Sequence, residues 1–391
     1  MNYTFADRVG TLQPSVIREI LKFSSVPGMI SFAAGNPAPE ACPIEQITEI
    51  SARIYAERPI DALQYSVTEG YQPLRDAVRE RYSFLFGEND QILITSGAQQ
   101  VMELTTKSLC NEGDTIICEA PTFIGSLNAF RSLNTHLVGI PMEEDGMNLN
   151  ALEDALKNND NVRFIYCIPN YQNPSGIVTS LEKRKAIYEL AKKYGTMILE
   201  DNPYGETRFA GDVIPTIKSM DTDGIVAYAG TFSKVISPGL RVGYAIAPAP
   251  LISKMTVCKQ VSDVHTPIYS QLVVHEFMTK YDYDAHLAGL GDIYRKKSDL
   301  MTSLLDLELA PRVSYVRPTG GLFIWCTLPD QIDMLDFAKQ AVARNVAVVP
   351  GNAFLVNESD PCNSIRLNYS TPTDEQIEKG MRILGELLSE Y

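Results

Sequence analysis

Metal-binding residues are scarce in this sequence. It has four histidines, and its seven cysteines never form a C-x-x-C pair. His275-Glu276 has no second histidine at the spacing of a zinc-binding helix, so we predict no metal site. The cysteines are odd in number and most lie in apolar runs such as TIICEA and FIYCIP, which is typical of reduced thiols in a protein core.

Long apolar runs and positive charge are also lacking. No stretch of about 18 apolar residues occurs, and the opening MNYTFADRVG contains no apolar signal core. The formal net charge of −14 disfavours general binding to nucleic acid or to anionic membranes. We therefore expect a cytoplasmic protein without nucleic-acid or membrane partners. The sequence also contains neither a P-loop nor a G-x-G-x-x-G element.

The order of the predicted elements is typical of an α/β fold. A lead-in helix is expected at 14–23, and from about residue 46 helix-like segments alternate with short apolar runs such as QILIT, FIYC and MILE. This alternation predicts a large domain with a mainly parallel, mixed sheet covered by helices. Near residue 290 the pattern becomes that of a smaller α+β domain. The expected division is an N-terminal arm and small-domain segment at 1–45, a large cofactor-binding domain at 46–288 and a small C-terminal domain at 289–391.

Polar residues gather where the predicted strands end. ILIT is followed by Ser96-Gly97-Ala98-Gln99, FIYCIP by Asn170-Tyr171-Gln172-Asn173, MILE by Asp201-Asn202-Pro203-Tyr204, and IVAYAG by Thr231-Phe232-Ser233-Lys234. In largely parallel sheets the strand ends meet at one edge, where ligands bind. These four loops therefore predict a single polar crevice.

Lys234 and Asp201 suggest the chemistry of that crevice. A lone lysine at a strand end is usually a solvated surface residue, but Phe232 and Val235 flank this one and disfavour solvent. A buried lysine loses its charge more easily, which suits Schiff-base formation. Asp201 has two readings, a turn-capping residue or a buried acid that pairs with a cation.

Groups that suit a phosphate accompany the lysine. Thr231 and Ser233 offer hydroxyls, and Arg241 offers a planar bidentate cation. The turn at Gly97 opens a helix whose N–H groups and dipole attract anions, although an ordinary helix start gives the same pattern. A phosphate site, an acid for a ring cation and an amine for an aldehyde together predict pyridoxal 5′-phosphate as the cofactor.

The chain resembles the fold-type-I pyridoxal-phosphate aminotransferases of class I and II. It is most similar to the branch of aromatic, 2-aminoadipate (kynurenine) and branched-chain aminotransferases. The resemblance extends nearly from end to end and rests on ISFAAGNP, ALQYSVTEG, TSGAQQ, EAPTFIGSL, PNYQNPSG, LEDNPYGE, TFSKVISPGLRVGY, RPTGGLFIW and SIRLNYS.

This resemblance implies the roles of the cofactor-binding residues. Lys234 would hold the cofactor aldehyde and later move the substrate proton, and Asp201 would pair with the pyridine nitrogen. Asn173 and Tyr204 would bind the phenolic oxygen of the ring. Phe123 would stack on the ring, although relatives often carry a tyrosine there. The phosphate would lie among Gly97, Ala98, Gln99, Thr231, Ser233 and Arg241; Ala98 stands where relatives often have serine.

The resemblance also implies a substrate site and a partner. Arg366 would bind the α-carboxylate of the substrate, assisted by Asn173 and the backbone of Gly35; taken alone, it reads as a surface strand arginine. Arg18 on the lead-in helix would approach the distal end of the substrate, and a surface role is the alternative. Tyr65 would reach the phosphate of the other subunit, which predicts a homodimer with shared active sites.

The expected activity is that of a transaminase. It would move the amino group of an aromatic, branched-chain or 2-aminoadipate-like L-amino acid to 2-oxoglutarate by a ping-pong mechanism, so its partners would be L-amino acids and 2-oxo acids. A carbon–sulfur β-lyase or a racemase on the same scaffold is the alternative. A regulator fused to a DNA-binding domain is disfavoured, because the match begins within the first dozen residues and the charge is acidic.

Overall fold

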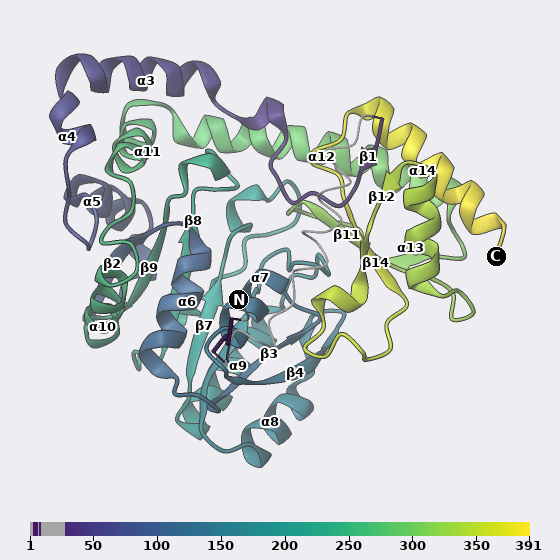
Figure 1. Ribbon diagram of the computed structural model, residues 1–391, viewed down its shortest axis with the longest axis horizontal. Coiled ribbons are helices and arrows are strands. Elements are labelled where there is room, and N and C mark those ends of the chain that lie inside the picture. The colour runs from purple at the N-terminus through teal and green to yellow at the C-terminus, as the bar shows by residue number, and fades with distance from the viewer. Residues whose placement is uncertain (1–2, 7, 9–27) are drawn as a thin grey trace.

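The computed structural model describes residues 3–6, 8 and 28–391, and Figure 1 follows the chain from end to end. The helix expected at 14–23, and Arg18 with it, lie outside the described residues.

An eight-stranded sheet forms the body of the fold, and a four-stranded sheet forms a second unit. The large sheet has the spatial order β2 (Asp90–Thr95), β9 (Gly243–Pro248), β8 (Val226–Thr231), β7 (Met197–Asp201), β6 (Val162–Cys167), β3 (Thr115–Ala120), β4 (His136–Glu143) and β5 (Gly146–Met147).

The large sheet is mixed, with a parallel centre. Strands β4, β3, β6, β7 and β8 run parallel, whereas β9 pairs antiparallel with both β8 and β2. The connection from β8 to β9, residues 232–242, contains no crossover helix, so β9 returns beside its predecessor in the opposite direction. The α/β fold class expected from the sequence is confirmed.

Alternate residues of the buried strands face two different layers of helices. In β3, Ile116 and Cys118 pack under one layer and Ile117 under the other, as the two-residue period of a strand requires. The first layer contains α6 (Ala98–Leu109), α7 (Ile124–Arg131) and α10 (Ala249–Gln260). The opposite layer contains α8 (Leu149–Asn158), α9 (Leu181–Tyr194), α5 (Gln72–Arg81) and α11 (Ile268–Lys280). Helices α3 (Ile44–Glu57) and α4 (Pro59–Leu63) pack on α11.

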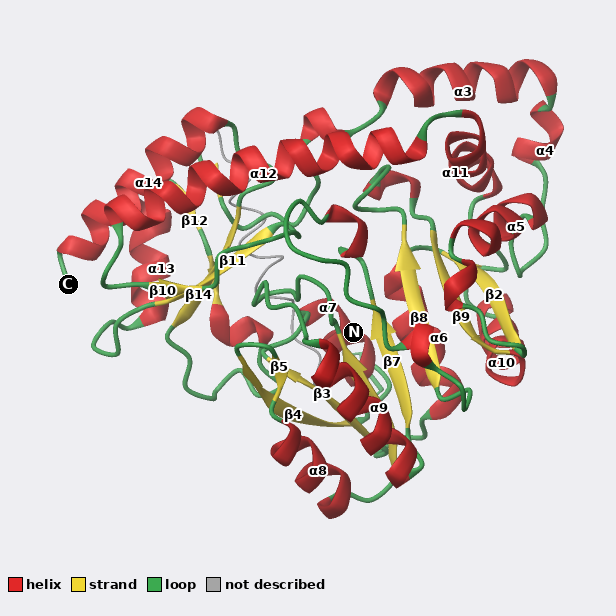
Figure 2. Ribbon diagram, turned by 180° about the vertical axis from the view of Figure 1, so that it is seen from behind, coloured by secondary structure: helices red, strands yellow, loops and turns green. Residues whose placement is uncertain are grey.

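The second unit is an antiparallel sheet with helices beside it. Its strands, in spatial order, are β10 (Ser314–Tyr315), β11 (Phe323–Thr327), β14 (Ser364–Asn368) and β13 (Val349–Pro350). Helices α13 (Met334–Ala343) and α14 (Asp374–Ser389) accompany it, and β1 (Ile30–Ser31) pairs with β12 (Val346–Ala347). Figure 2 shows α12 (Tyr283–Glu308) running from the large unit to the small one. The residue boundaries of the three-part division stay a prediction, and α12 spans the second of them.

Local signals in the sequence define the ends of several helices. Ser180 caps α9 by accepting a hydrogen bond from the Lys183 N–H, and Gly195 ends the helix in the left-handed conformation at φ 66°. Thr373 and Gln376 form a reciprocal capping box at the start of α14. No helix in the described part of the chain is long and apolar enough to cross a membrane.

Arg184 ties the loop after β6 to the rest of the large unit. Its side chain is fully buried and donates five hydrogen bonds, to the carbonyls of Thr179, Ile214, Pro215 and Pro169 and to Oδ1 of Asn170. One guanidinium thus satisfies acceptors on two segments that are distant in sequence. The loop it holds carries Asn173.

We expect Arg184→Met to lower the free energy of unfolding by about 3 kcal/mol or more, because it leaves buried carbonyl oxygens without a donor. Urea unfolding followed by circular dichroism measures the change. Lys185→Met, at an exposed position of the same helix, is the matched control and should stay within about 0.5 kcal/mol of the parent. Equal losses in both variants would show that the buried donor set of Arg184 contributes nothing special.

Candidate active site

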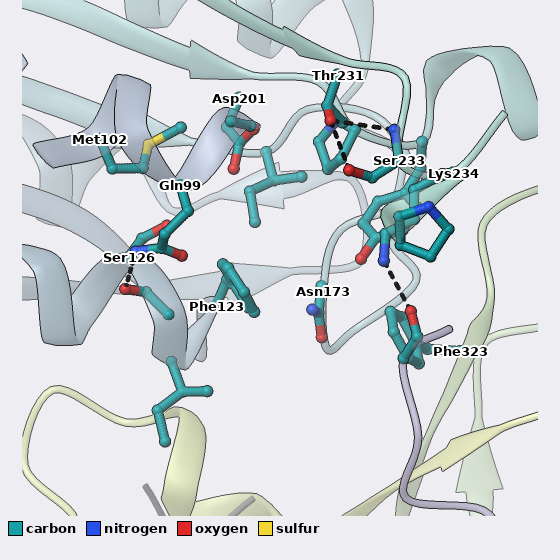
Figure 3. A pocket seen from close by; sticks show the side chains of 18 of the residues that line it. Gln99, Met102, Phe123, Ser126, Asn173, Asp201, Thr231, Ser233, Lys234 and Phe323 are labelled. Carbon is teal, nitrogen blue, oxygen red and sulfur yellow. Dashed lines mark hydrogen bonds between the residues drawn. The ribbon is translucent and has the colours of Figure 1, made fainter. Parts of the chain in front are cut away.

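The strand-end residues line a cavity of about 470 Å³ between the two units (Figure 3). Its walls come from the ends of β7 and β8, the first turns of α6 and α7, and the strands β11 and β14. The predicted site residues that line it are Gly35, Ala98, Gln99, Phe123, Asn173, Asp201, Tyr204, Thr231, Ser233, Lys234, Arg241 and Arg366. Gly97 lies directly before Ala98. Tyr65 does not line this cavity and is 83% exposed.

Lys234 projects its amine into the middle of the cavity. It lies three residues beyond the end of β8, and its Nζ donates to the Gly35 carbonyl at 2.7 Å. Burial lowers the pKa of the amine to about 8, the positive charges of Arg366 and Arg241 act in the same direction, and Asp201 opposes them. A larger fraction of this amine is therefore uncharged near neutral pH than for an ordinary lysine, which favours nucleophilic and basic chemistry.

Asp201 is the last residue of β7, and its carboxyl group is almost completely buried. Oδ2 accepts a hydrogen bond from the Tyr166 hydroxyl at 2.8 Å, and the buried Oδ1 has no partner among the described residues. Burial raises the pKa of this group to about 7, against the opposing effects of Tyr166 and Lys234. No backbone N–H of the described residues donates a hydrogen bond to either carboxylate oxygen of Asp201, so the turn-capping alternative is wrong.

A concave group of anion-binding donors lies at the start of α6. Gly97, at φ 83°, precedes the helix, and Arg241, at φ 54°, turns its guanidinium toward the same turn. Arg241 donates to the Ser96 carbonyl at 3.1 Å and to Oγ of Ser233 at 3.4 Å. Thr231 Oγ1 donates to Ser233 Oγ at 3.0 Å. Hydroxyls, a guanidinium and the helix N-terminus together favour a dianion.

Only glycine fits at position 97. A Cβ built there would lie 2.4 Å from a terminal nitrogen of Arg241. The positive φ adds backbone strain for any other residue. The close approach of helix start and guanidinium therefore depends on the missing side chain.

Arg366 lies on β14 and is 2% exposed, so the surface alternative is wrong. It donates to Asn173 Oδ1 at 3.0 Å and to the Ala33 carbonyl at 2.8 Å, while its buried Nε has no described partner. The guanidinium lies over the rings of Phe323 and Phe354, at 4.2 and 5.0 Å from their centroids. Burial lowers its pKa to about 10. A buried cation whose described partners are all neutral favours an anionic ligand.

Three residues at this site were not predicted from the sequence. Tyr166, which donates a hydrogen bond to Asp201, lies inside the apolar run FIYCIP and was not predicted. Phe323 belongs to the quoted RPTGGLFIW element, but its place beneath Arg366 was not predicted. Ser126 lines the cavity from α7 and was not predicted. The described residues contain no group of three or more side chains that could hold a metal ion.

The arrangement fits pyridoxal phosphate. The donors around Gly97 and Arg241 suit its phosphate, the unpartnered Oδ1 of Asp201 suits a protonated ring nitrogen, and the Lys234 amine suits its aldehyde. The protein therefore offers a complementary group for the phosphate, the ring nitrogen and the aldehyde of the cofactor.

Comparisons with known proteins agree with this fit. The family model described as "Aminotransferase class I and II" matches residues 27–384. Aromatic-amino-acid aminotransferase 1 of Thermococcus litoralis is 38% identical over 99% of this chain and 94% of its own length. The 2-aminoadipate transaminase of Thermus thermophilus is 39% identical over 98% and 96%.

A solved structure extends the likeness to the cofactor. LysN, the alpha-aminoadipate aminotransferase of Thermus thermophilus, complexed with N-(5′-phosphopyridoxyl)-L-leucine, superposes with a TM-score of 0.91 at 38% identity, covering 99% of this chain and 97% of that one. The chain therefore belongs to the class I and II aminotransferases and is a transaminase that depends on pyridoxal phosphate.

Proposed function

We propose that this enzyme moves the amino group of an aromatic, branched-chain or 2-aminoadipate-like L-amino acid to 2-oxoglutarate in two half-reactions of a ping-pong cycle. The observation that carries the proposal is the convergence of three charged groups, the partly buried Lys234 and the buried Asp201 and Arg366, on one cavity. The names of the relatives, which refer to aromatic amino acids and 2-aminoadipate, support the range of donors.

We assign the cofactor to the side of the cavity formed by the large unit. When bound, pyridoxal phosphate supplies an aldehyde for amino groups and a cationic ring that withdraws electrons from the reacting carbon. The amides of Gly97, Ala98 and Gln99, the hydroxyls of Thr231 and Ser233, and Arg241 would hold its phosphate. Asp201 would bind the ring nitrogen, Asn173 and Tyr204 the phenolic oxygen, and Phe123 would lie against the ring face.

Lys234 acts as the proton carrier in this proposal. Its free Nζ would accept the proton from the substrate α-carbon, hold it and later give it up. The lowered pKa keeps part of the amine unprotonated near neutral pH, and the tether to the chain gives it a high effective concentration.

Arg366 binds the α-carboxylate in this proposal, with Asn173 and the Gly35 backbone beside it. The guanidinium is fixed by Asn173 Oδ1 and by the Ala33 carbonyl, and both are neutral. A substrate carboxylate would supply the counter-charge that the described surroundings lack. The substrate α-carbon would then lie between this group and the Lys234 amine.

A homodimer completes the proposed enzyme. The segment that follows α3 exposes a group of apolar side chains: Ile60, Leu63, Tyr65 and Val67 are between 57% and 83% exposed. Such a patch on a water-soluble surface favours burial against a second copy. From there Tyr65 would reach the phosphate of the partner. We keep the cytoplasm as the proposed location.

Addition of single amino acids to the pure holoenzyme tests the proposed function. We expect aromatic, branched-chain or 2-aminoadipate-like donors to convert the cofactor absorbance to that of the pyridoxamine form, and 2-oxoglutarate to reverse the change. Lys234→Ala should retain some cofactor without covalent attachment yet lose turnover. Release of pyruvate and ammonia without the pyridoxamine form would indicate a β-lyase instead. Substantial turnover by Lys234→Ala would remove the assignment of the proton carrier.

Gly97→Ala tests the assigned phosphate site. The added methyl displaces the Arg241 guanidinium, so we expect the dissociation constant of pyridoxal phosphate, measured by equilibrium dialysis, to rise about tenfold or more. Gly211→Ala is the matched control, because Gly211 has φ +71° but an added Cβ there meets nothing within 4 Å. Its strain is similar and its cofactor affinity should be unchanged. Equal affinities of the two variants would contradict the assignment.

Arg366→Lys tests the carboxylate site. Lysine keeps the charge but loses the planar fork, so we expect kcat/KM to fall about 100-fold for amino acid and 2-oxo acid alike, with cofactor affinity little changed. Arg317→Lys, at a half-exposed arginine paired with Asp306, provides the control and should change kcat/KM less than about twofold. A variant of Arg366 with near-normal kinetics for both substrates would place the carboxylate elsewhere.

A further inference from the structure

A chain of hydrogen bonds runs from Ser126, which lines the cavity from α7, through Tyr166 to Asp201. Ser126 of α7 donates from Oγ to the Tyr166 hydroxyl at 2.7 Å, and Tyr166 of β6 donates to Asp201 Oδ2 at 2.8 Å. The side chains of Ser126 and Tyr166 are fully buried, and Asp201 is 3% exposed. The three residues come from a helix and two adjacent strands, so the packing of the large sheet fixes their spacing.

The direction of this chain is determined by the chemistry of its members. A phenol has one proton to donate, and Tyr166 gives it to the carboxylate while accepting from Ser126. Burial, reinforced by the charge of Asp201, raises the pKa of Tyr166 well above its usual value, so the hydroxyl remains a donor at all ordinary pH values. Oδ2 of Asp201 is thereby engaged, and Oδ1 is left without a partner.

We propose that Tyr166 is a positioning residue that acts through Asp201: it holds the carboxylate in its ionised form and turns Oδ1 toward the ring nitrogen of the cofactor. The inference rests on the proposed role of Asp201 as partner of that nitrogen. It gives the buried hydroxyl of Tyr166 a task separate from the packing of its ring.

The packing task is visible as well. The Tyr166 ring meets Phe130 edge-on, with centroids 5.2 Å apart, in the core beneath α7. Phenylalanine at this position keeps the ring and removes only the hydroxyl. Tyr166→Phe therefore separates the two tasks.

Several other titratable groups interact electrostatically with Asp201. Burial raises the pKa of the nearby Glu119 carboxyl to about 8, so this acid is mostly neutral at pH 7 and adds little competing negative charge. The titratable groups with a hydrogen bond or electrostatic interaction with Asp201 are Tyr166, Lys234, Glu119, Tyr204, Tyr228 and Cys167. Tyr166 is the one of them that donates a hydrogen bond to its carboxylate.

Loss of the donor has a defined consequence for pH dependence. The Tyr166 bond lowers the pKa of Asp201, so its removal raises that pKa above the present value of about 7. At pH 7 a larger fraction of Asp201 then carries a proton and binds a cationic ring poorly. The affinity returns as the pH rises past the new pKa.

The experiment measures the dissociation constant of pyridoxal phosphate between pH 6 and pH 9 by equilibrium dialysis. For Tyr166→Phe we expect about tenfold weaker binding at pH 7, and a midpoint of the acidic limb displaced to higher pH. Tyr188→Phe is the matched control, because it removes a buried tyrosine hydroxyl that donates to a carboxylate, Asp223 at 2.6 Å, outside the cavity. The control should keep the affinity and midpoint of the parent.

A double variant decides whether Tyr166 acts through Asp201. In an Asp201→Asn background there is no carboxylate to hold, so Tyr166→Phe should change cofactor affinity by less than about twofold, as expected for a pair that acts as one unit. A tenfold loss in that background, or an unshifted midpoint in the single variant, would overturn the proposal.

If Tyr166→Phe fails to fold, Ser126→Ala removes the donor to the hydroxyl and should move the midpoint in the same direction by less. A parent protein that binds the cofactor but does not transaminate would sink the proposed function and leave this readout intact.

Discussion

The site depends on charged side chains that the fold places in one cavity without a partner of opposite charge among the described residues. Asp201, Lys234 and Arg366 line one cavity. Burial raises the pKa of Asp201 and lowers those of Lys234 and Arg366, so it favours the neutral form of each group. None of the three forms a salt bridge within the described chain, although Lys234 and Asp201 sense one another's charge. In the proposed assignment, a cationic ring nitrogen balances Asp201 and a substrate carboxylate balances Arg366, so binding relieves part of the desolvation cost of these two groups.

The sheet can impose that cost because its own polar groups are well satisfied. The buried Glu200 beside Asp201 accepts hydrogen bonds from the N–H groups of Ile217 and Lys218, and it is therefore a structural acid. Arg184 likewise satisfies five acceptors. Adjacent positions on one strand thus differ in kind: the side chain of Glu200 faces backbone donors, and that of Asp201 faces the cavity. The alternation of a β-strand separates the structural acid from the one available to a ligand.

The position of the site could be predicted from the sequence, whereas the residues that hold the site residues in place could not. Strand-end loops that contain Asp201 and Lys234 follow from the pattern of apolar runs, because parallel strands end at a common edge. The strand β4 was not predicted, since HLVGIPME contains glycine and proline and its burial is uneven. Tyr166 could not be recognised, because an apolar strand gives no sign that one of its hydroxyls meets a carboxylate from the neighbouring strand. That contact depends on the register of β6 and β7, which pairs Tyr166 with Leu199.

The two ends of the cavity have separate structural origins, and this separation bears on how the enzyme is tuned. The anion-binding donors around Gly97 and Arg241 belong to the large sheet and its first helix layer. Arg366 belongs to the small sheet, and the Gly35 carbonyl that meets Lys234 belongs to the segment after β1. In the proposed assignment, we therefore expect a change near Gly97 or Arg241 to alter cofactor affinity and a change at Arg366 to alter binding of the substrate carboxylate. Lys234 lies between the two ends, and the positive charges of Arg366 on one side and Arg241 on the other both lower the pKa of its amine.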